Sequence, residues 1–448
     1  MLLRSYAVSL ALPLSFYAAV ALDLDVNSLD SIKSTAKTIA SAIVGSYNDN
    51  LEEERVPGLF EEPYYWWEAG AVWESLLEYS HLTGDSQFND LISTGILHQV
   101  GDYDAFMPPN QTKTLGNADQ ATWGLAAMTA AEIGFPEPSG ETKWVDLAVN
   151  VFNTQAARWD EESCGGGLKW QIFTFNNGYN YKNTWSNAGF FLLSARLALF
   201  TKNETYSQWA EEAYQWMQDV GLISDFHAFD GTDDRANCSQ INHIQWTCNH
   251  AMLTEGAALL YNLTSGDNTW KDAVTGFVNA SSVFQNDTIL SEVACENNGK
   301  CDVDQKAFKG VAVRSFARAA IAAPFASESI NTMLQASAKG AAANCDGDGN
   351  DLTCGLRWTG ENDDADSVDD GGLGEAFSAM AAVQALLWPQ AEPVESGNST
   401  SPSPSASGTG SPSGTGGAAG PENTNAAGMT VASWGTAFLG AVFAVLLL

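Results

Sequence analysis

The sequence predicts an all-α protein, an (α/α)6 barrel of six helical hairpins in a single domain. Between residues 28 and 389, twelve helix-like segments of two alternating kinds follow one another, and alternating β-branched runs are few. A glycine recurs near the start of most segments of the first kind, at intervals of 54, 65, 121 (two repeats) and 64 residues. A repeat of about 60 residues is one helical hairpin. These glycines are Gly70, Gly124, Gly189, Gly310 and Gly374.

Segments of the first kind begin with aromatic residues and continue with Ala, Gly, Leu and Phe, with few charges. A helix that is apolar around most of its circumference is buried, so we expect these segments to form an inner ring. They are residues 64–79, 119–133, 184–200, 244–263, 305–322 and 372–387.

Segments of the second kind are amphipathic and are expected on the outside of the ring. Their apolar residues recur three and four positions apart, as in Trp144, Leu147, Val151 and Phe152. They are residues 28–47, 86–99, 142–158, 205–219, 268–284 and 327–343. An open solenoid of helix pairs is the alternative, but it would leave one face of the apolar inner helices in water.

The N-terminal residues 1–21 have the pattern of a secretory signal peptide. Arg4 precedes an apolar run from Val8 to Val20, and Ala19–Ala21 fits a small-x-small cleavage site. We therefore expect the chain to enter the secretory pathway, with its folded domain covering residues 22–390.

The C-terminal part predicts a stalk and a membrane anchor. Residues 391–425 are rich in Ser, Thr, Pro and Gly and are expected to form an extended stalk. Residues 426–448 end in an apolar tail, which is typical of a propeptide removed when a GPI anchor is attached, here at Asn425. A transmembrane helix is the alternative, but the tail is short and no Lys or Arg follows it.

Composition narrows the possible partners and the redox chemistry. The chain has 20 Lys and Arg residues against 54 Asp and Glu residues, a formal net charge of -34 that excludes nucleic acid as a partner. All seven cysteines follow the signal peptide, so disulfides are expected. Local loops are expected between Cys295 and Cys301 and between Cys345 and Cys354. At least one thiol stays unpaired among Cys164, Cys238 and Cys248. We expect no metal site and no cofactor.

Asn-x-Ser/Thr sequons predict a glycosylated surface. The expected glycan sites are Asn110, Asn203, Asn262, Asn279, Asn286 and Asn398. A further sequon at Asn237 is weaker because Cys238 is its middle residue.

In a closed barrel of this kind, the loops that lead into the inner helices meet at one end. The sequence places aromatic residues beside Asn, Gln and Asp at these helix starts. A sugar packs its C–H face on an aromatic ring and bonds polar groups through its hydroxyls, so this end is predicted to bind a glycan. A single Trp is equally well explained as a core residue, but six clusters at equivalent positions favour the cleft. The candidate substrate-binding residues are Trp66, Trp67, Asn117, Gln120, Trp123, Asn180, Tyr181, Asn187, Asp230, Gln245, Trp246 and Asp370.

Several stretches follow one another in the order of a known family. They include LGNADQATWGLAAMTAAE at 115–132, CGGGLKWQIFTFNNGYNYKNTWSNAGF at 164–190, NHIQWTCNHA at 242–251 and GGLGEAFSAMAAVQAL at 371–386. The chain resembles the family-76 glycoside hydrolases, the fungal mannan endo-1,6-α-mannosidase-like proteins of the cell wall. The resemblance also implies a disulfide between Cys164 and Cys238.

The resemblance implies an activity and a location. The expected reaction is hydrolysis or transglycosylation of α-1,6-mannosidic linkages in mannan or in a GPI-anchor glycan, with wall β-glucan as an acceptor. The expected place is the outer face of the plasma membrane and the cell wall, in cell-wall biogenesis.

The turn before residues 119–133 carries the expected catalytic group. The family has two adjacent aspartates there, a nucleophile and an acid/base; here Ala118 takes the place of the nucleophile and Asp119 matches the acid/base. Because glycoside hydrolysis usually needs two carboxylates, a catalytically inactive glycan-binding paralogue is the alternative function. Asp230 and Asp369–Asp370 are the candidates for a second carboxylate at the mouth.

Local helix rules predict the ionisation of Asp119. Asn117 followed by Gln120 is interpreted as an N-cap with its N3 partner, which places Asp119 at N2. A helix N-terminus favours the charged carboxylate, and without a second aspartate no like charge opposes it. We therefore expect a lowered pKa for Asp119, which would leave it ionised and make it a poorer proton donor. A role in capping this helix alone is the structural alternative.

Overall fold

The computed structural model describes residues 21–49, 56–359 and 371–391. Most of the predicted signal peptide and stalk, and the whole predicted propeptide, lie outside these residues. Asp369, Asp370, Asn398 and Asn425 also lie outside them. Within the three described ranges, no helix is long and apolar enough to cross a membrane.

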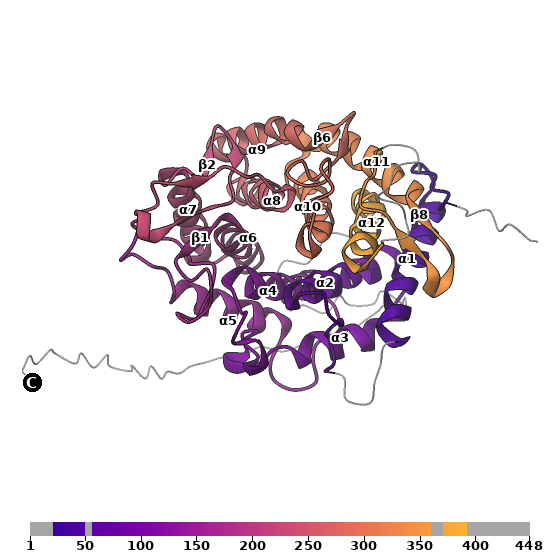
Figure 1. Cartoon of the computed structure of the whole chain (residues 1–448), viewed down its shortest axis with the longest axis horizontal. Helices are drawn as coiled ribbons and strands as arrows, with labels where there is room; N and C mark the ends of the chain where they lie inside the picture. The colour runs from indigo at the N-terminus through magenta and orange to yellow at the C-terminus, as the bar shows by residue number, and fades with distance from the viewer. Residues whose placement is uncertain (1–20, 50–55, 360–370, 392–448) are drawn as a thin grey trace, which may run out of the picture. The chain divides into compact units, whose positions relative to one another are not determined.

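Six helices form the predicted inner ring. Each packs against the next in chain order, and the last packs against the first, so the ring is closed (Figure 1). This closure confirms the (α/α)6 barrel and excludes the open solenoid. The inner helices are α2 (Trp66–Thr83), α4 (Asn117–Glu132), α6 (Thr184–Thr201), α8 (Thr247–Leu263), α10 (Val303–Ala322) and α12 (Leu373–Ala385).

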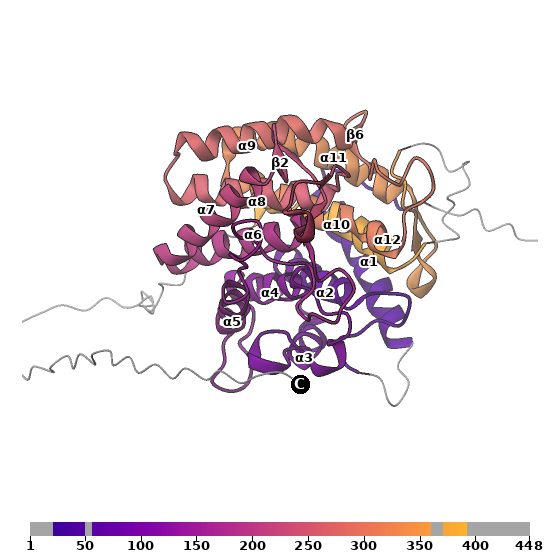
Figure 2. The ribbon, with the colours of Figure 1, turned by 60° about the vertical axis from the view of Figure 1, so that its left-hand side comes forward.

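Six amphipathic helices cover the ring, as predicted. In α5, the residues Trp144, Leu147, Val151 and Phe152 are all buried. Figure 2 shows α9 along α8 and α5 beside α4. The outer helices are α1 (Leu29–Asp49), α3 (Asn89–His98), α5 (Trp144–Ala156), α7 (Glu204–Asp219), α9 (Asn268–Ala280) and α11 (Ser327–Ala343).

The recurring glycines allow the inner helices to approach closely. A Cβ added to Gly189 of α6 would lie 2.8 Å from the Cβ of Ala121 on α4, and one added to Gly310 would lie 2.4 Å from the ring of Phe377 on α12. Such distances are too short for van der Waals contact. The repeat seen in the sequence is therefore a packing requirement of the ring.

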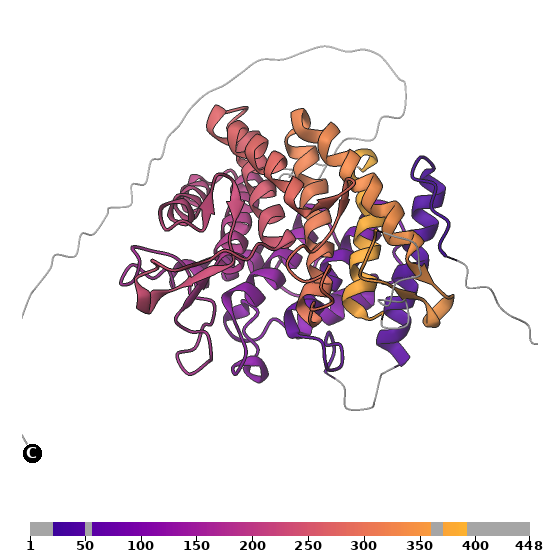
Figure 3. The same cartoon turned by 45° about the horizontal axis from the view of Figure 1, so that its top comes forward.

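Short strands lie in the connections between helices. The largest sheet is antiparallel with the order β1-β4-β5, and Tyr181 pairs with Asp233 while Gly231 pairs with Asn242. Its strands are β1 (Tyr181–Asn183), β4 (Gly231–Asp233) and β5 (Ile241–Asn242). Figure 3 shows these strands beside the helical ring. Three two-stranded hairpins pair β2 (Ile223–Ser224) with β3 (His227–Ala228), β6 (Gln285–Asn286) with β7 (Ile289–Leu290), and β8 (Cys345–Asp346) with β9 (Thr353–Cys354).

The interior of the ring contains a buried ion-pair cluster, which we call the arginine network. Its members come from five inner helices: Glu74 and Glu78 from α2, Glu132 from α4, Arg196 from α6, Glu255 from α8, and Arg314 and Arg318 from α10. Arg314 donates two hydrogen bonds to Glu78, at 2.7 and 3.0 Å. Arg318 pairs with glutamates of three different helices. The network therefore fixes the relative positions of the helices that carry the site.

The cysteines pair as expected. Disulfides join Cys295 to Cys301 and Cys345 to Cys354, and the pairing of Cys164 with Cys238 confirms the one implied by the resemblance. Cys248 is free and buried in α8. The five glycosylation-site asparagines within the described ranges are exposed, so the structure leaves each accessible to a glycan: Asn110, Asn203, Asn262, Asn279 and Asn286.

Candidate active site

The N-terminal ends of the inner helices meet around one cavity of about 490 Å³. Residues at the starts of α2, α4, α6, α8 and α10 line it, as the sequence predicts for the mouth of a barrel. Of the candidates from the sequence, Trp66, Trp67, Ala118, Asp119, Asp230 and Trp246 line the cavity. Other lining residues include Tyr65, Lys113, Trp170, Gln171, Asn177, Asn183, Trp185, Asn249, Asp304, Gln305 and Phe308.

The first turn of α4 begins one residue earlier than predicted. Gly116 is the N-cap, so Asn117 is the first helical residue and Asp119 stands at N3. Asp119 Oδ2 accepts a hydrogen bond from the Gly116 amide at 3.1 Å. A Cβ at residue 116 would lie 2.5 Å from this oxygen, so only glycine allows the carboxylate to fold back there. The prediction of Asn117 as N-cap and Asp119 at N2 was wrong because the glycine caps without a side chain.

Asn117 and Gln120 hold this turn from behind rather than lining the cavity. Arg158 donates from Nε to Asn117 Oδ1 at 2.9 Å and also bonds Gln120 Oε1. Asn117 Nδ2 donates to the Lys169 carbonyl at 2.8 Å, and Gln120 Nε2 donates to the Ala105 carbonyl at 2.7 Å. Both side chains are buried, so they position the turn and do not lie where a substrate could reach them.

Burial raises the pKa of Asp119, so near neutral pH it is a better proton donor than the sequence predicts. Removal from water is the largest cause that raises its pKa, which reaches about 7; the negative charge of Asp304 acts in the same direction, and the Gly116 hydrogen bond acts against both. The expected lowering was wrong, because the helix-terminus argument considers only the local backbone and not the cavity wall. A carboxyl group with this pKa keeps a proton in mildly acidic conditions and can donate it.

Two further carboxylates share the cavity with Asp119. Asp230 accepts from Trp246 Nε1 at 2.8 Å, from the Tyr181 hydroxyl at 2.5 Å and from Asn242 Nδ2 at 3.0 Å. Asp304, in the first turn of α10, accepts from Trp67 Nε1 at 2.8 Å. Asp304 was not among the site residues predicted from the sequence; its place in the first turn of an inner helix, like that of Asp119, is the signal that could have identified it.

An aromatic cluster forms part of the cavity wall. Phe308 packs against Trp67, Trp185 and Trp246, with ring centroids 6.1, 5.0 and 5.4 Å apart. The rings of Trp67 and Trp185 lie 4.7 Å apart, edge to face. Asp304 and Asp230 are hydrogen-bonded to the indoles of this cluster, so apolar faces and carboxylates are presented together, as the recognition of a sugar requires.

Other predicted substrate-binding residues lie outside the cavity lining. Trp123 is fully buried and donates to the Trp66 carbonyl, and Asn187 is fully buried and bonds Leu168. Tyr181 acts on the site through Asp230, and Gln245 bonds His227. The Asn180 carbonyl accepts from the amide of Asp234. Sequence position near a helix start was therefore not enough to decide which side chains face the cavity.

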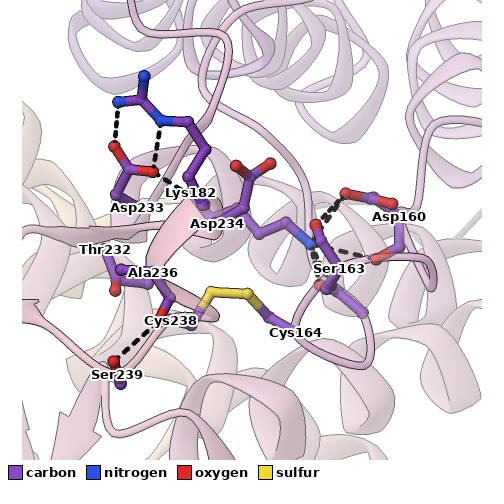
Figure 4. Close-up of a disulfide and its surroundings, with 12 residues drawn as sticks. Asp160, Ser163, Cys164, Lys182, Thr232, Asp233, Asp234, Ala236, Cys238 and Ser239 are labelled. Carbon is purple, nitrogen blue, oxygen red and sulfur yellow. Dashed lines mark hydrogen bonds and ion pairs between the residues drawn. A yellow bond between two sulfur atoms is a disulfide. The ribbon is translucent and has the colours of Figure 1, made fainter.

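A disulfide ties together two segments that carry cavity residues. Cys164 precedes Trp170 and Gln171 in the chain, and Cys238 follows Asp230. Figure 4 shows the disulfide between Cys164 and Cys238. Beside it, the buried Lys182 Nζ donates to the carbonyls of Ser163 and Gly166 at 2.7 and 2.5 Å. These bonds hold the loop that carries the indole of Trp170 against β1.

No group of three or more His, Cys, Asp or Glu side chains in the described part of the chain is arranged to hold a metal ion. The loop between Cys345 and Cys354 is a short hairpin formed by β8 and β9.

The fold and the site together define a class of protein, an (α/α)6-barrel carbohydrate-active protein with a carboxyl group in an aromatic cavity. Residues 31–398 match glycosyl hydrolase family 76. The chain belongs to this family.

Relatives and solved structures agree with this membership. The chain is 41% identical over 392 residues to the mannan endo-1,6-alpha-mannosidase DCW1 of Eremothecium gossypii, covering 86% of each chain. The crystal structure of Dfg5 from Chaetomium thermophilum in complex with glucosamine is 39% identical, with a TM-score of 0.78, covering 84% of this chain and 94% of that one.

A more distant structure shares the fold. It is an alpha-1,6-mannanase of a Salegentibacter species in complex with alpha-1,6-mannotriose, 17% identical with a TM-score of 0.62, covering 80% of this chain and 99% of that one. That protein is an inactive variant in which two consecutive aspartates are replaced by asparagine.

Proposed function

We propose that the protein cleaves α-1,6-mannosidic linkages, with Asp119 as the acid. The observation that carries this proposal is the cavity-facing carboxyl group of Asp119, whose pKa burial raises to about 7. The curated relatives named mannan endo-1,6-alpha-mannosidase support the choice of substrate.

The geometry supports a specific role for each wall of the cavity. Asp119 protonates the glycosidic oxygen as the bond to the anomeric carbon breaks. The indoles of Trp67 and Trp246 offer apolar surface to the mannosyl ring, and Asp230 offers an anionic acceptor for hydroxyl groups. A bound sugar excludes water from the cavity and strengthens these electrostatic interactions.

A catalytically inactive glycan-binding protein is the second candidate function, and Ala118 is the observation that favours it. Ala118 lines the cavity next to Asp119, at the position where the family resemblance implies a nucleophile. A methyl group can neither attack the anomeric carbon nor activate water. Under this alternative the cavity binds mannan chains without cleaving them.

The place of action is part of the same proposal. The signal-peptide pattern at 1–21 and the GPI-type tail at 426–448 support an anchored protein on the outer face of the plasma membrane and in the cell wall. The mannose core of GPI anchors is a further substrate, and wall β-glucan is the acceptor if the glycosyl group is transferred.

The test compares turnover and binding of α-1,6-mannotriose by wild type, Asp119→Asn and Glu68→Gln. Glu68 is the matched control: it is also a buried N3 carboxyl with a raised pKa, but it does not line the cavity. We expect wild-type turnover, a loss of about 10²- to 10⁴-fold in Asp119→Asn, and a change of only a few-fold in Glu68→Gln.

The outcome that contradicts the enzyme proposal is binding by the wild type without turnover. A gain of turnover in Ala118→Asp would then establish the glycan-binding paralogue. Wild-type turnover that disappears in Asp119→Asn would exclude it.

A further inference from the structure

Glycoside hydrolysis usually uses a second carboxylate besides the acid, here Asp119. Ala118 cannot supply it. Within the described residues, the other aspartates that line the cavity are Asp230 and Asp304. The two differ in how many of their oxygen atoms already have partners.

Both oxygens of Asp230 are engaged by protein donors. Oδ1 accepts from the indole of Trp246, and Oδ2 accepts from both Tyr181 and Asn242. Three donors around one carboxylate fix its orientation and occupy lone pairs that an attacking water molecule would need. Asp230 is therefore held by the protein through both oxygens and has less room than Asp304 to orient a water molecule.

Asp304 has only one such bond. Its Oδ1 accepts from Trp67 Nε1 at 2.8 Å, and within the described residues no hydrogen bond engages its Oδ2. The anchoring indole belongs to the aromatic cluster, and Phe308 lies one helical turn further along α10. The carboxylate of this cavity-lining residue is thus held by one oxygen, and the other has no hydrogen bond to a described residue.

The electrostatics connect Asp304 with the acid. The negative charge of Asp304 raises the pKa of Asp119, after the larger effect of burial. Asp304 itself is half-buried, and burial raises its own pKa as well, partly offset by the Trp67 hydrogen bond. Two interacting carboxyl groups in one cavity are the arrangement that acid–base glycoside cleavage uses.

We propose that Asp304 is the second catalytic carboxylate and acts as the base toward water. This inference rests on the proposed function. Asp304 takes a proton from a water molecule, whose oxygen bonds to the anomeric carbon. The bond from that carbon to the leaving oxygen breaks, and the leaving oxygen receives the proton of Asp119. The water replaces the leaving group from the opposite face, so the configuration inverts, and an α-mannoside gives a β-anomer.

The role of Asp304 also decides whether the protein hydrolyses the linkage or transfers the glycosyl group to another sugar. Without a nucleophile at residue 118, no covalent glycosyl intermediate forms there, so no enzyme-bound glycosyl group is available for transfer to a sugar acceptor. The protein is then a hydrolase.

The test follows the first-formed anomer by proton NMR during cleavage of α-1,6-mannotriose, with binding measured by calorimetry. The variants are Asp304→Asn, which keeps an acceptor for Trp67, and Asp302→Asn. Asp302 is the matched control because it is exposed, caps the same helix and does not line the cavity, and asparagine is an equally good cap.

We expect the wild type and Asp302→Asn to release the β-anomer first. Asp304→Asn should lose about 10²- to 10⁴-fold in kcat while its affinity for mannotriose changes by only a few-fold. Release of the α-anomer first, or full activity of Asp304→Asn, would overturn this inference and leave the proposed function intact. Binding without turnover by the wild type would overturn both.

Discussion

Asp119 at the mouth of the barrel and Glu74 in the arginine network have pKa values that are shifted in opposite directions. At the mouth, burial raises the pKa of Asp119 to about 7 and those of Glu68 and Glu292 to about 8. In the arginine network, burial acts in the same direction, but the charges of Arg314 and Arg196 outweigh it and lower the pKa of Glu74 to about 2. The difference lies in the partners: among the residues that the structure describes, no arginine forms an ion pair with Asp119, Glu68 or Glu292, whereas Glu74 pairs with two.

This contrast distinguishes a carboxyl group that can donate a proton, Asp119, from carboxylates that hold the helices together, those of the arginine network. A carboxylate between two arginines, such as Glu74, stays charged and joins helices, whereas burial without such compensation favours the protonated form. The network has three arginines and four glutamates, and Glu255 is a member whose pKa burial raises. Asp119 is therefore able to donate a proton because no arginine of the described residues forms an ion pair with it; Arg158, behind the same turn, bonds Asn117 and Gln120 instead.

The largest effect is expected on stability when an arginine of the network is removed, as in Arg318→Met. Arg318 pairs with Glu78, Glu132 and Glu255. Its removal leaves buried negative charge without compensation, which costs about 3–5 kcal/mol. We expect this decrease in the free energy of unfolding, measured by denaturant titration with disulfides intact.

The control is Arg235→Met, which removes an ion pair with Asp233 on the surface. Surface pairs contribute about 0–1 kcal/mol, so little change is expected. Equal destabilisation by the two substitutions would contradict a special role for the arginine network.

A smaller effect is expected in the pH dependence of stability. Between about pH 4.5 and 8 the folded protein keeps a proton on Glu68 that the unfolded chain has released, so stability is lost as the pH rises through this window. Glu74 has the opposite sign: its contribution is present above about pH 4.5 and is lost as the pH falls toward 2. Stability should therefore be highest in mildly acidic solution.

Glu68→Gln sharpens this test because it removes one of the protonated acids and keeps the shape of the side chain. Between pH 5 and 8 its unfolding free energy should fall by about 1–3 kcal/mol less than that of the wild type. Its melting temperature should fall less over the same range. Parallel curves for the two proteins over this range would show that Glu68 is ionised in the fold.

Much of the fold could be predicted from the sequence because the repeat is a physical requirement. The apolar inner segments and amphipathic outer segments correspond to the twelve α-helices, and glycines such as Gly310 occur where helices touch. Boundaries were less accurate. Asn117 was taken as a cap because its side chain suits that role, but Gly116 is the cap and Asn117 binds Arg158.

The site could be predicted only in part, because periodicity does not tell which face of a first turn points into the cavity. Trp67 and Asp119 line it, while Gln120 and Trp123, on the same helix as Asp119, are buried in packing. The pKa of Asp119 depends on the walls contributed by distant segments, including Asp304. No local rule contains that information.

Asp119 can act as the acid only if its carboxyl group holds a proton in mildly acidic to neutral solution. Carbon-13 NMR of the protein labelled at the aspartate carboxyl carbons would follow its titration, with Asp119→Asn used to assign the signal. The structure predicts a midpoint of about 7. A midpoint at or below the ordinary aspartate value of about 3.9 would mean that Asp119 is ionised at the mouth, and it would contradict its role as the acid.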